Sequence, residues 1–129
     1  MSAVLPNATA VANRMRTGFA RVGNNQTTGR LARFDAEGTP TSACALGALA
    51  LGFQERFGSN SQLDDIRANR INLASLGIAN PNVTPPTGGY DRPLEHVIVE
   101  LNDNKGWSIE KIARWIESLG DEDSICETA

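Results

Sequence analysis

The stretch Thr41-Ser-Ala-Cys-Ala-Leu-Gly-Ala-Leu-Ala-Leu-Gly-Phe53 decides how this chain of 129 residues folds. No charged residue stands between Glu37 and Glu55, and small or apolar residues occupy every side of a helical wheel over this stretch. A helix that is apolar on all sides is usually buried on all sides. The stretch is too short to span a bilayer, which takes roughly 20 apolar residues. We therefore predict a buried central helix over residues 41–57, with the remaining chain packed around it.

Two glycines lie inside this predicted helix, Gly47 and Gly52. Glycine in a helix interior costs roughly 1 kcal/mol relative to alanine. Their presence indicates that something approaches the helix backbone closely, either a neighbouring helix or a ligand.

Apolar residues at spacings of three and four predict further helices on both sides of the central one. The first begins after Asn7, and two more begin after Asp91 and Ser108, all residue types that favour a helix N-cap. Residues 77–93 are expected to form one long loop rich in proline and glycine, and no segment shows a strong strand pattern. The predicted fold class is all-α, a compact bundle of about five helices around the central helix.

The composition is that of an ordinary globular protein, with 40% hydrophobic and 21% charged residues. A chain of this length buries a core without help from a metal or a disulfide. We expect a single all-α domain over residues 1–120 and an acidic C-terminal tail over residues 121–129. Cys44 falls in the predicted core and Cys126 in the tail, so we expect no disulfide between them.

The first residues lack the basic segment and the long apolar segment of a signal peptide. No stretch is long and apolar enough to predict a transmembrane helix. We therefore expect a cytoplasmic protein without a membrane partner.

Charge is distributed unevenly around a net value of −3. Residues 1–34 hold five arginines, no lysine and no acid, whereas residues 116–129 hold five acids and no base. Such a distribution indicates an acidic partner at the arginine-rich end, attraction between the two ends within the fold, or two ends that are simply solvated. We expect the partner to contact the first helix, residues 24–40 and the loop 77–93. The binding residues predicted there are Arg14, Arg21, Arg30, Arg33 and Tyr90.

Three motifs follow one another along the chain. They are Gly29-Arg-Leu-Ala-Arg-Phe-Asp-Ala-Glu-Gly38, Cys44-Ala-Leu-Gly-Ala-Leu49, and Leu101-Asn-Asp103 with Gly106-Trp-Ser108-Ile-Glu-Lys-Ile112. Together they resemble an uncharacterised family of small bacterial, mainly actinobacterial, and phage proteins. Leu101 departs from the aromatic residue that the family carries before its Asn-Asp pair. The family has no established activity, so the resemblance implies a fold and a class, with a phage-linked or defence-linked setting.

Cys44 lies near the start of the predicted central helix, where the helix dipole lowers the pKa of a thiol. The only histidine, His96, comes later and is followed by Asn102 and Asp103. This order is that of papain-like hydrolases, in which histidine is the base and asparagine orients it. We favour the interpretation of Cys44 as a small buried structural cysteine, because no strand is predicted to carry the histidine. We assign no catalytic residue and keep these four as candidates of an alternative interpretation.

His96 and Glu100 lie four residues apart on one predicted helix, a spacing that can supply two metal ligands. No further histidine or paired cysteine completes a site, so we predict no metal and no cofactor. The segment Asn102-Asp-Asn-Lys-Gly106 lacks the alternating acids of a calcium loop. We expect its first two residues to cap backbone groups at Trp107 and Ser108 instead.

Residues 105–115 resemble the entry to a helix-turn-helix, but acidic residues follow where a basic recognition helix would lie. We therefore expect no nucleic acid partner. The leading hypothesis is a small non-enzymatic interaction or regulatory protein that binds another, acidic protein. Two alternatives stay open. One is a cysteine-dependent hydrolase or transferase that uses Cys44 and His96. The other is a self-assembling structural subunit, a homo-oligomer joined through its oppositely charged ends.

Overall fold

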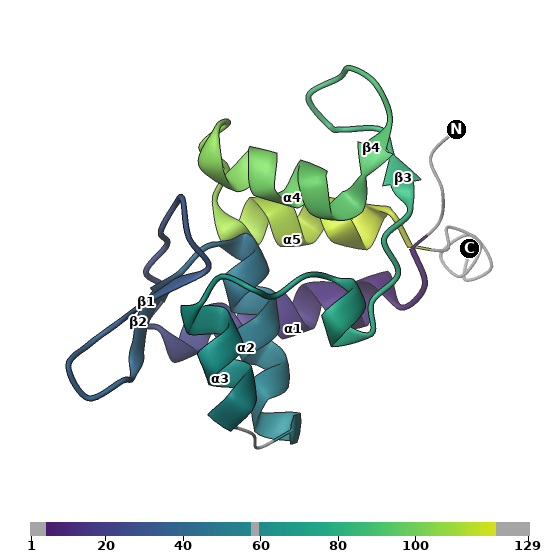
Figure 1. Ribbon diagram of the computed structural model, residues 1–129. Coiled ribbons are helices and arrows are strands. Elements are labelled where there is room, and N and C mark those ends of the chain that lie inside the picture. The colour runs from purple at the N-terminus through teal and green to yellow at the C-terminus, as the bar shows by residue number, and fades with distance from the viewer. Residues whose placement is uncertain (1–4, 58–59, 121–129) are drawn as a thin grey trace.

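The computed structural model of the protein describes residues 5–57 and 60–120, with side chains outside 54–63. These residues form five α-helices, one 3-10 helix and two small antiparallel sheets (Figure 1). In chain order the elements are α1 (Ala8–Arg21), β1 (Ala32–Phe34), β2 (Pro40–Ala43), α2 (Ala45–Phe57), α3 (Asn60–Arg67), η1 (Ala74–Leu76), β3 (Asn82–Val83), β4 (Arg92–Pro93), α4 (Leu94–Asp103) and α5 (Ile109–Ser118). The prediction of an all-α fold is therefore wrong, because the protein is mixed α and β.

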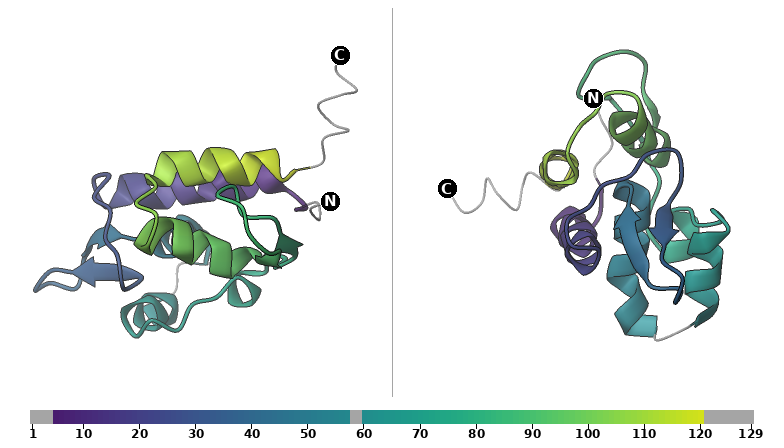
Figure 2. Two further views of the ribbon diagram at one scale, coloured as in Figure 1. Left: turned by 90° about the horizontal axis from the view of Figure 1, so that it is seen from above. Right: turned by 90° about the vertical axis from the view of Figure 1, so that its left-hand side faces the viewer.

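Helix α2 lies in the middle of the molecule, in contact with α1, α3 and α4. The right-hand view of Figure 2 shows α1, α2 and α3 side by side, with α5 and α4 above them. All side chains from Ala45 to Gly52 are buried. The expectation of a buried central helix is confirmed in its position and corrected in its start. The helix begins at Ala45, and residues 41–43, predicted to be in its first turn, belong to strand β2 instead.

The first sheet is the hairpin of β1 and β2. Its register pairs Ala32 with Ala43, Arg33 with Ser42 and, after a bulge, Phe34 with Pro40. The turn is held by the carboxylate of Asp35, whose Oδ1 accepts from the backbone N–H groups of Glu37 and Thr39, each at 2.9 Å. Strands of three and four residues are too short to show an alternating pattern, and the apolar residues that follow favoured a continuous helix. An isolated two-stranded hairpin is marginal in water, so this one depends on packing against the helices.

Glycines permit three close backbone contacts around α2. A Cβ built on Gly18 of α1 would lie 1.7 Å from the carbonyl oxygen of Ala48, and one built on Gly47 would lie 1.8 Å from that of Leu31. A Cβ on Gly52 would lie 1.9 Å from the carbonyl oxygen of Arg14. The two glycines noted in the sequence therefore accommodate neighbouring chain segments rather than a ligand.

The second sheet lies inside residues 77–93, which were predicted to be one irregular loop. Strand β3 pairs antiparallel with β4, Asn82 with Pro93 and Val83 with Arg92. Asp91 does not cap α4 as predicted. Its Oδ1 accepts from the hydroxyl of Thr84 at 2.7 Å and closes the base of the loop between the strands.

Of the two other predicted N-caps, one is confirmed. Ser108 caps α5 as predicted, because its hydroxyl accepts from the backbone N–H of Lys111 at 3.1 Å. Asn7 precedes α1, but its side chain makes no capping hydrogen bond.

Other expectations concern the ends of the chain. Arg16 of α1 binds Glu117 of α5, which matches the predicted attraction between the two ends, and also Glu110, which precedes the acidic segment 116–129. Cys44 is a free thiol. Cys126 and the predicted acidic tail 121–129 lie outside the described residues.

Within the described part of the chain, every helix is too short or too polar to cross a membrane.

Candidate functional site

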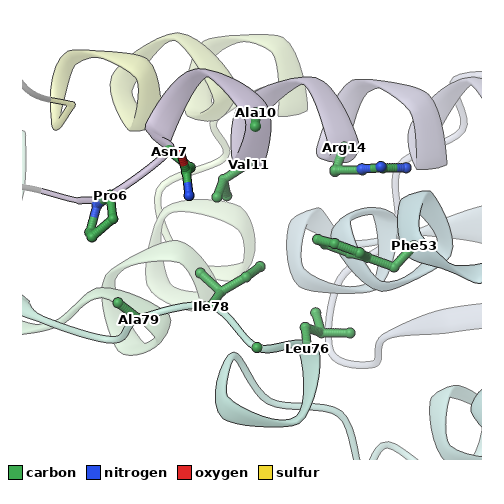
Figure 3. Close-up of a pocket in the computed structure, with 10 residues that line it drawn as sticks. Pro6, Asn7, Ala10, Val11, Arg14, Phe53, Leu76, Ile78 and Ala79 are labelled. Atoms are coloured by element: carbon green, nitrogen blue, oxygen red, sulfur yellow. The ribbon is translucent and has the colours of Figure 1, made fainter. Parts of the chain in front are cut away.

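A cavity of about 450 Å³ lies between the first half of α1, the end of α2 and the segment that follows η1. Figure 3 shows α1 along one side, residues 76–79 along the opposite side and Phe53 of α2 near one end. We call it the Arg14 cavity. Its volume falls in the range of small-molecule sites, roughly 300–1,000 Å³. Its apolar lining includes Pro6, Ala10, Val11, Phe53, Leu76 and Ile78.

Among the described residues that line the cavity, Arg14 alone carries a charge. Its guanidinium carbon lies 5.1 Å from the centre of the Phe53 ring, and its Nη1 donates to the carbonyl oxygen of Gly52 at 3.2 Å. The close contact of α1 and α2 at Gly52 explains this position. Because no space remains between the two backbones, the side chain extends along the cavity wall over the aromatic ring (Figure 3).

Two successive arginines of α1, Arg14 and Arg16, have opposite environments. Arg16 binds Glu117 at 2.6 Å and Glu110 at 2.9 Å, and these hydrogen-bonded carboxylates raise the pKa of its guanidinium. No carboxylate of a described residue forms an ion pair with Arg14. Arginine keeps its charge in proteins. Arg14 therefore brings a positive charge without an acidic partner among the described residues to an otherwise uncharged lining.

Asn7 contributes a second polar group at the opposite end of the cavity. Its backbone is left-handed, with φ at 58°, and its side chain makes no hydrogen bond to the start of α1. Figure 3 shows the amide directed toward the cavity. Asparagine tolerates this conformation better than most residues, but the conformation forgoes the usual cap.

Cys44 is buried directly before the first residue of α2, beside a shallow hollow of about 240 Å³. Burial raises the pKa of its thiol, although the backbone N–H of Gly47 donates to Sγ at 3.3 Å and opposes that effect. Asp103, which lines the same hollow, raises the pKa further. The predicted lowering of this pKa by the helix dipole is therefore wrong, since desolvation dominates.

The structure brings two other members of the hydrolase interpretation close to Cys44, since Asp103 lines the same hollow and Asn102 bonds the backbone of Ala45, but it does not bring the histidine there. His96 is exposed on α4, is absent from the lining of the hollow, and forms no hydrogen bond or ion pair with a described residue. Glu100, which has metal-ligand spacing from His96, pairs with Arg92. Over the described residues, no three side chains of histidine, cysteine, aspartate or glutamate lie close enough to hold a metal ion.

Asn102 is a buried structural residue, with 2% of its surface exposed. Its Oδ1 accepts from the backbone N–H of Ala45 at 3.0 Å and from Nε2 of Gln26 at 2.8 Å. Its Nδ2 donates to the carbonyl oxygen of Thr27 at 3.0 Å and to Asp103 Oδ1 at 2.8 Å. The predicted capping of residues 107 and 108 by this Asn-Asp pair is wrong, because both side chains turn toward residues 26–29 and α2.

The predicted binding residues lie in several places. Arg14 lines the Arg14 cavity, and Arg30 lines the hollow beside Cys44. Arg33 is on β1, where its Nε donates to the hydroxyl of Thr27 at 3.0 Å. Arg21 is exposed at the end of α1. Tyr90, 88% exposed, lies between β3 and β4, a hairpin far from the β1–β2 hairpin (Figures 1 and 2).

Sequence reasoning missed most of the Arg14 cavity. Arg14 was noted for its charge, but Phe53 was expected only as part of the central helix, and Leu76 and Ile78 were not singled out. The lining comes from three segments far apart in the chain, and no local pattern indicates that they meet. One feature of the sequence did mark this region. Asn7, a residue type that favours a helix N-cap, directly follows Pro6, and both residues line the cavity.

Comparison of the chain with protein-family models, curated proteins and solved structures found no significant match. The resemblance to the bacterial and phage family therefore stays a prediction based on the three motifs.

Proposed function

We propose that this chain is a small non-enzymatic binding protein whose site is the Arg14 cavity. A single observation carries the proposal: a cavity of ligand size, lined mostly by apolar residues, contains one arginine without an acidic partner among the described residues. The guanidinium is half-buried and binds the Gly52 carbonyl and the Phe53 ring, which leaves N–H donors that a bound ligand can use.

The arrangement around Cys44 supports a binding role over catalysis. A thiol with a raised pKa is a poor nucleophile, and no described histidine forms a hydrogen bond with it. The proposal keeps the interaction or regulatory role and the cytoplasmic setting expected from the sequence, and moves the binding site from the arginine-rich surface to the cavity.

The test is a titration with two apolar probes, decanoate and its neutral amide decanamide, followed in amide proton–nitrogen NMR spectra. Ala10→Phe places a ring at an exposed position that lines the cavity. Ala20→Phe makes the same change at an exposed position of α1 that does not line it. We expect saturable shifts at the lining residues in the wild-type protein and in Ala20→Phe, and their loss in Ala10→Phe.

Either of two results contradicts the proposal. One is that neither probe shifts the lining residues. The other is that Ala10→Phe binds the probes as the wild-type protein does.

A further inference from the structure

The charge of the Arg14 cavity restricts the kind of ligand it accepts. One cation and no described acid line it, so the complementary ligand carries a single negative charge. A phosphate group at neutral pH carries close to two charges and is usually held by several donors or cations. A carboxylate carries one charge, and the planar fork of a guanidinium matches its two oxygens.

The Arg14 guanidinium retains hydrogen-bonding capacity for such a group. Arginine has five N–H donors, and the described structure uses one of them, from Nη1 to the carbonyl oxygen of Gly52. The Phe53 ring lies beneath the guanidinium and fixes its plane. The side chain is thus held in place before a ligand arrives, which lowers the entropic cost of binding.

Apart from the Asn7 amide at the far end, the remainder of the lining suits an apolar body. Val11, Leu76 and Ile78 extend from the Arg14 end toward Pro6 and lie on opposite walls (Figure 3). The cavity volume of about 450 Å³ lies in the range of small-molecule sites, and a carboxylate with about ten carbon atoms is a ligand of that size class.

The surface favours a small molecule over a protein partner. A stable protein interface buries more than about 1,000 Å² and has an apolar centre. Among the described residues, the large apolar side chains that are exposed are Tyr90 and Val99, and neither lines the Arg14 cavity. The apolar surface near Arg14 faces into the cavity, where a small ligand reaches it.

We propose that the ligand is a small monocarboxylic acid with an apolar body of about ten carbon atoms, its carboxylate bound by Arg14 and its body by the apolar lining. This inference rests on the proposed function, because it specifies what the Arg14 cavity binds.

The test compares decanoate with decanamide by calorimetry, using the full chain. The two probes share their body and differ in charge, so their affinity ratio reports the contribution of Arg14. We expect decanoate to bind at least ~10-fold more tightly than decanamide, as hydrogen bonds to charged groups allow. The ratio should fall toward one in Arg14→Gln and recover in part in Arg14→Lys.

The outcomes separate the two proposals. If both probes bind the wild-type protein with equal affinity, the acid assignment is overturned and the binding function stands. If neither binds, both fail. Because the wild-type ratio needs no variant, the inference remains testable even if Arg14→Gln does not fold.

A last experiment distinguishes a small carboxylic acid from the C-terminus of a peptide as the ligand. An acetylated tripeptide ending in leucine presents the same group on a chain terminus. Weaker binding of this peptide than of decanoate is expected, and tighter binding would overturn the small-molecule assignment in favour of a partner's C-terminus.

Discussion

Asn102 joins three parts of the chain through one side-chain amide. It connects the start of α2 at Ala45, the segment around Thr27, and its own helix α4 at Asp103. Gln26 extends the network to the connection between α4 and α5. Its Nε2 donates to the carbonyl oxygen of Trp107, and its Oε1 accepts from the backbone N–H of Ile109. A buried polar group of this kind stabilises only when all its bonds are made.

Asn102→Ala should destabilise the fold by about 3 kcal/mol and lower Tm by roughly 10 °C, because it leaves the buried N–H of Ala45 and the carbonyl of Thr27 without partners. Urea and thermal unfolding followed by circular dichroism measure the loss. Asn104→Ala, an exposed substitution in the same segment, is the control and should stay within about 0.5 kcal/mol of wild type. Equal stability of the two variants would remove Asn102 from its structural role.

Cys44 should resist alkylation in the native protein, since its thiol is buried and its pKa is raised. In a Cys126→Ser background, iodoacetamide labelling at about pH 8 should be at least ~100-fold slower than after denaturation. Mass spectrometry of the intact chain follows the reaction. Labelling of the native protein at the rate of a free thiol would revive the hydrolase interpretation.

At the scale of elements, the contact of α1 with α2 positions the site. Gly18 and Gly52 bring the two backbones together, and this closeness directs Arg14 along the cavity wall. The cost of glycine in a helix, about 1 kcal/mol for each residue, is therefore offset by packing that no larger residue permits.

Gly18→Ala should destabilise the protein by about 2–3 kcal/mol, although alanine favours the helix, because the new Cβ would collide with the carbonyl oxygen of Ala48. Thr17→Ala changes the exposed neighbouring position and should have little effect. Thermal melting of both variants tests this. A Gly18→Ala variant as stable as wild type would show that the helices separate freely.

The ion pairs between α1 and α5 should make stability fall in acid. Hydrogen bonds from Arg16 lower the pKa of Glu117 and of Glu110 below their ordinary values, about 4.3 when unfolded. The stabilisation is complete above the unfolded pKa and is lost as pH falls through the lower folded pKa values. Because both carboxylates are partly exposed, we expect a total of about 1 kcal/mol.

Tm measured between about pH 6 and pH 3 should therefore drop less steeply in Arg16→Gln than in wild type. Arg70→Gln removes an exposed ion pair with Asp65 and serves as the control, with the wild-type slope expected. Parallel curves for Arg16→Gln and wild type would contradict the role of this cluster.

The helices were predictable and the strands were not. The apolar stripes of α1, α4 and α5 repeat over several turns, and the start of α5 at Ser108 follows from its cap. Strands of two to four residues contain no complete period, and their pairing is decided by tertiary contacts such as that of Gly47 with Leu31. Because β2 is also too short to show a strand pattern, the central helix was predicted to start at residue 41, inside β2, rather than at Ala45.

For the whole molecule, the site could be predicted only in part. The charge of α1 indicated that its arginines matter, but charge alone does not separate Arg14 from Arg16, which has carboxylate partners. That difference appears once α5 lies against one face of α1 and α2 against another. Residue types predict what a side chain can bind, whereas the assembled fold decides what it meets.

The backbone N–H of Leu5 donates to the carbonyl oxygen of Leu119 at 2.7 Å, so the chain enters and leaves the fold at one place. This proximity makes the molecule a candidate for circular permutation. Joining the chain ends with a flexible linker and opening the chain between Gly88 and Gly89, in an exposed loop, should preserve the fold and a cooperative melt. Opening it between Thr28 and Gly29 should not, because that cut falls within the Asn102 network. The same geometry lets the whole unit be inserted into a surface loop of a host protein without separating the host's ends.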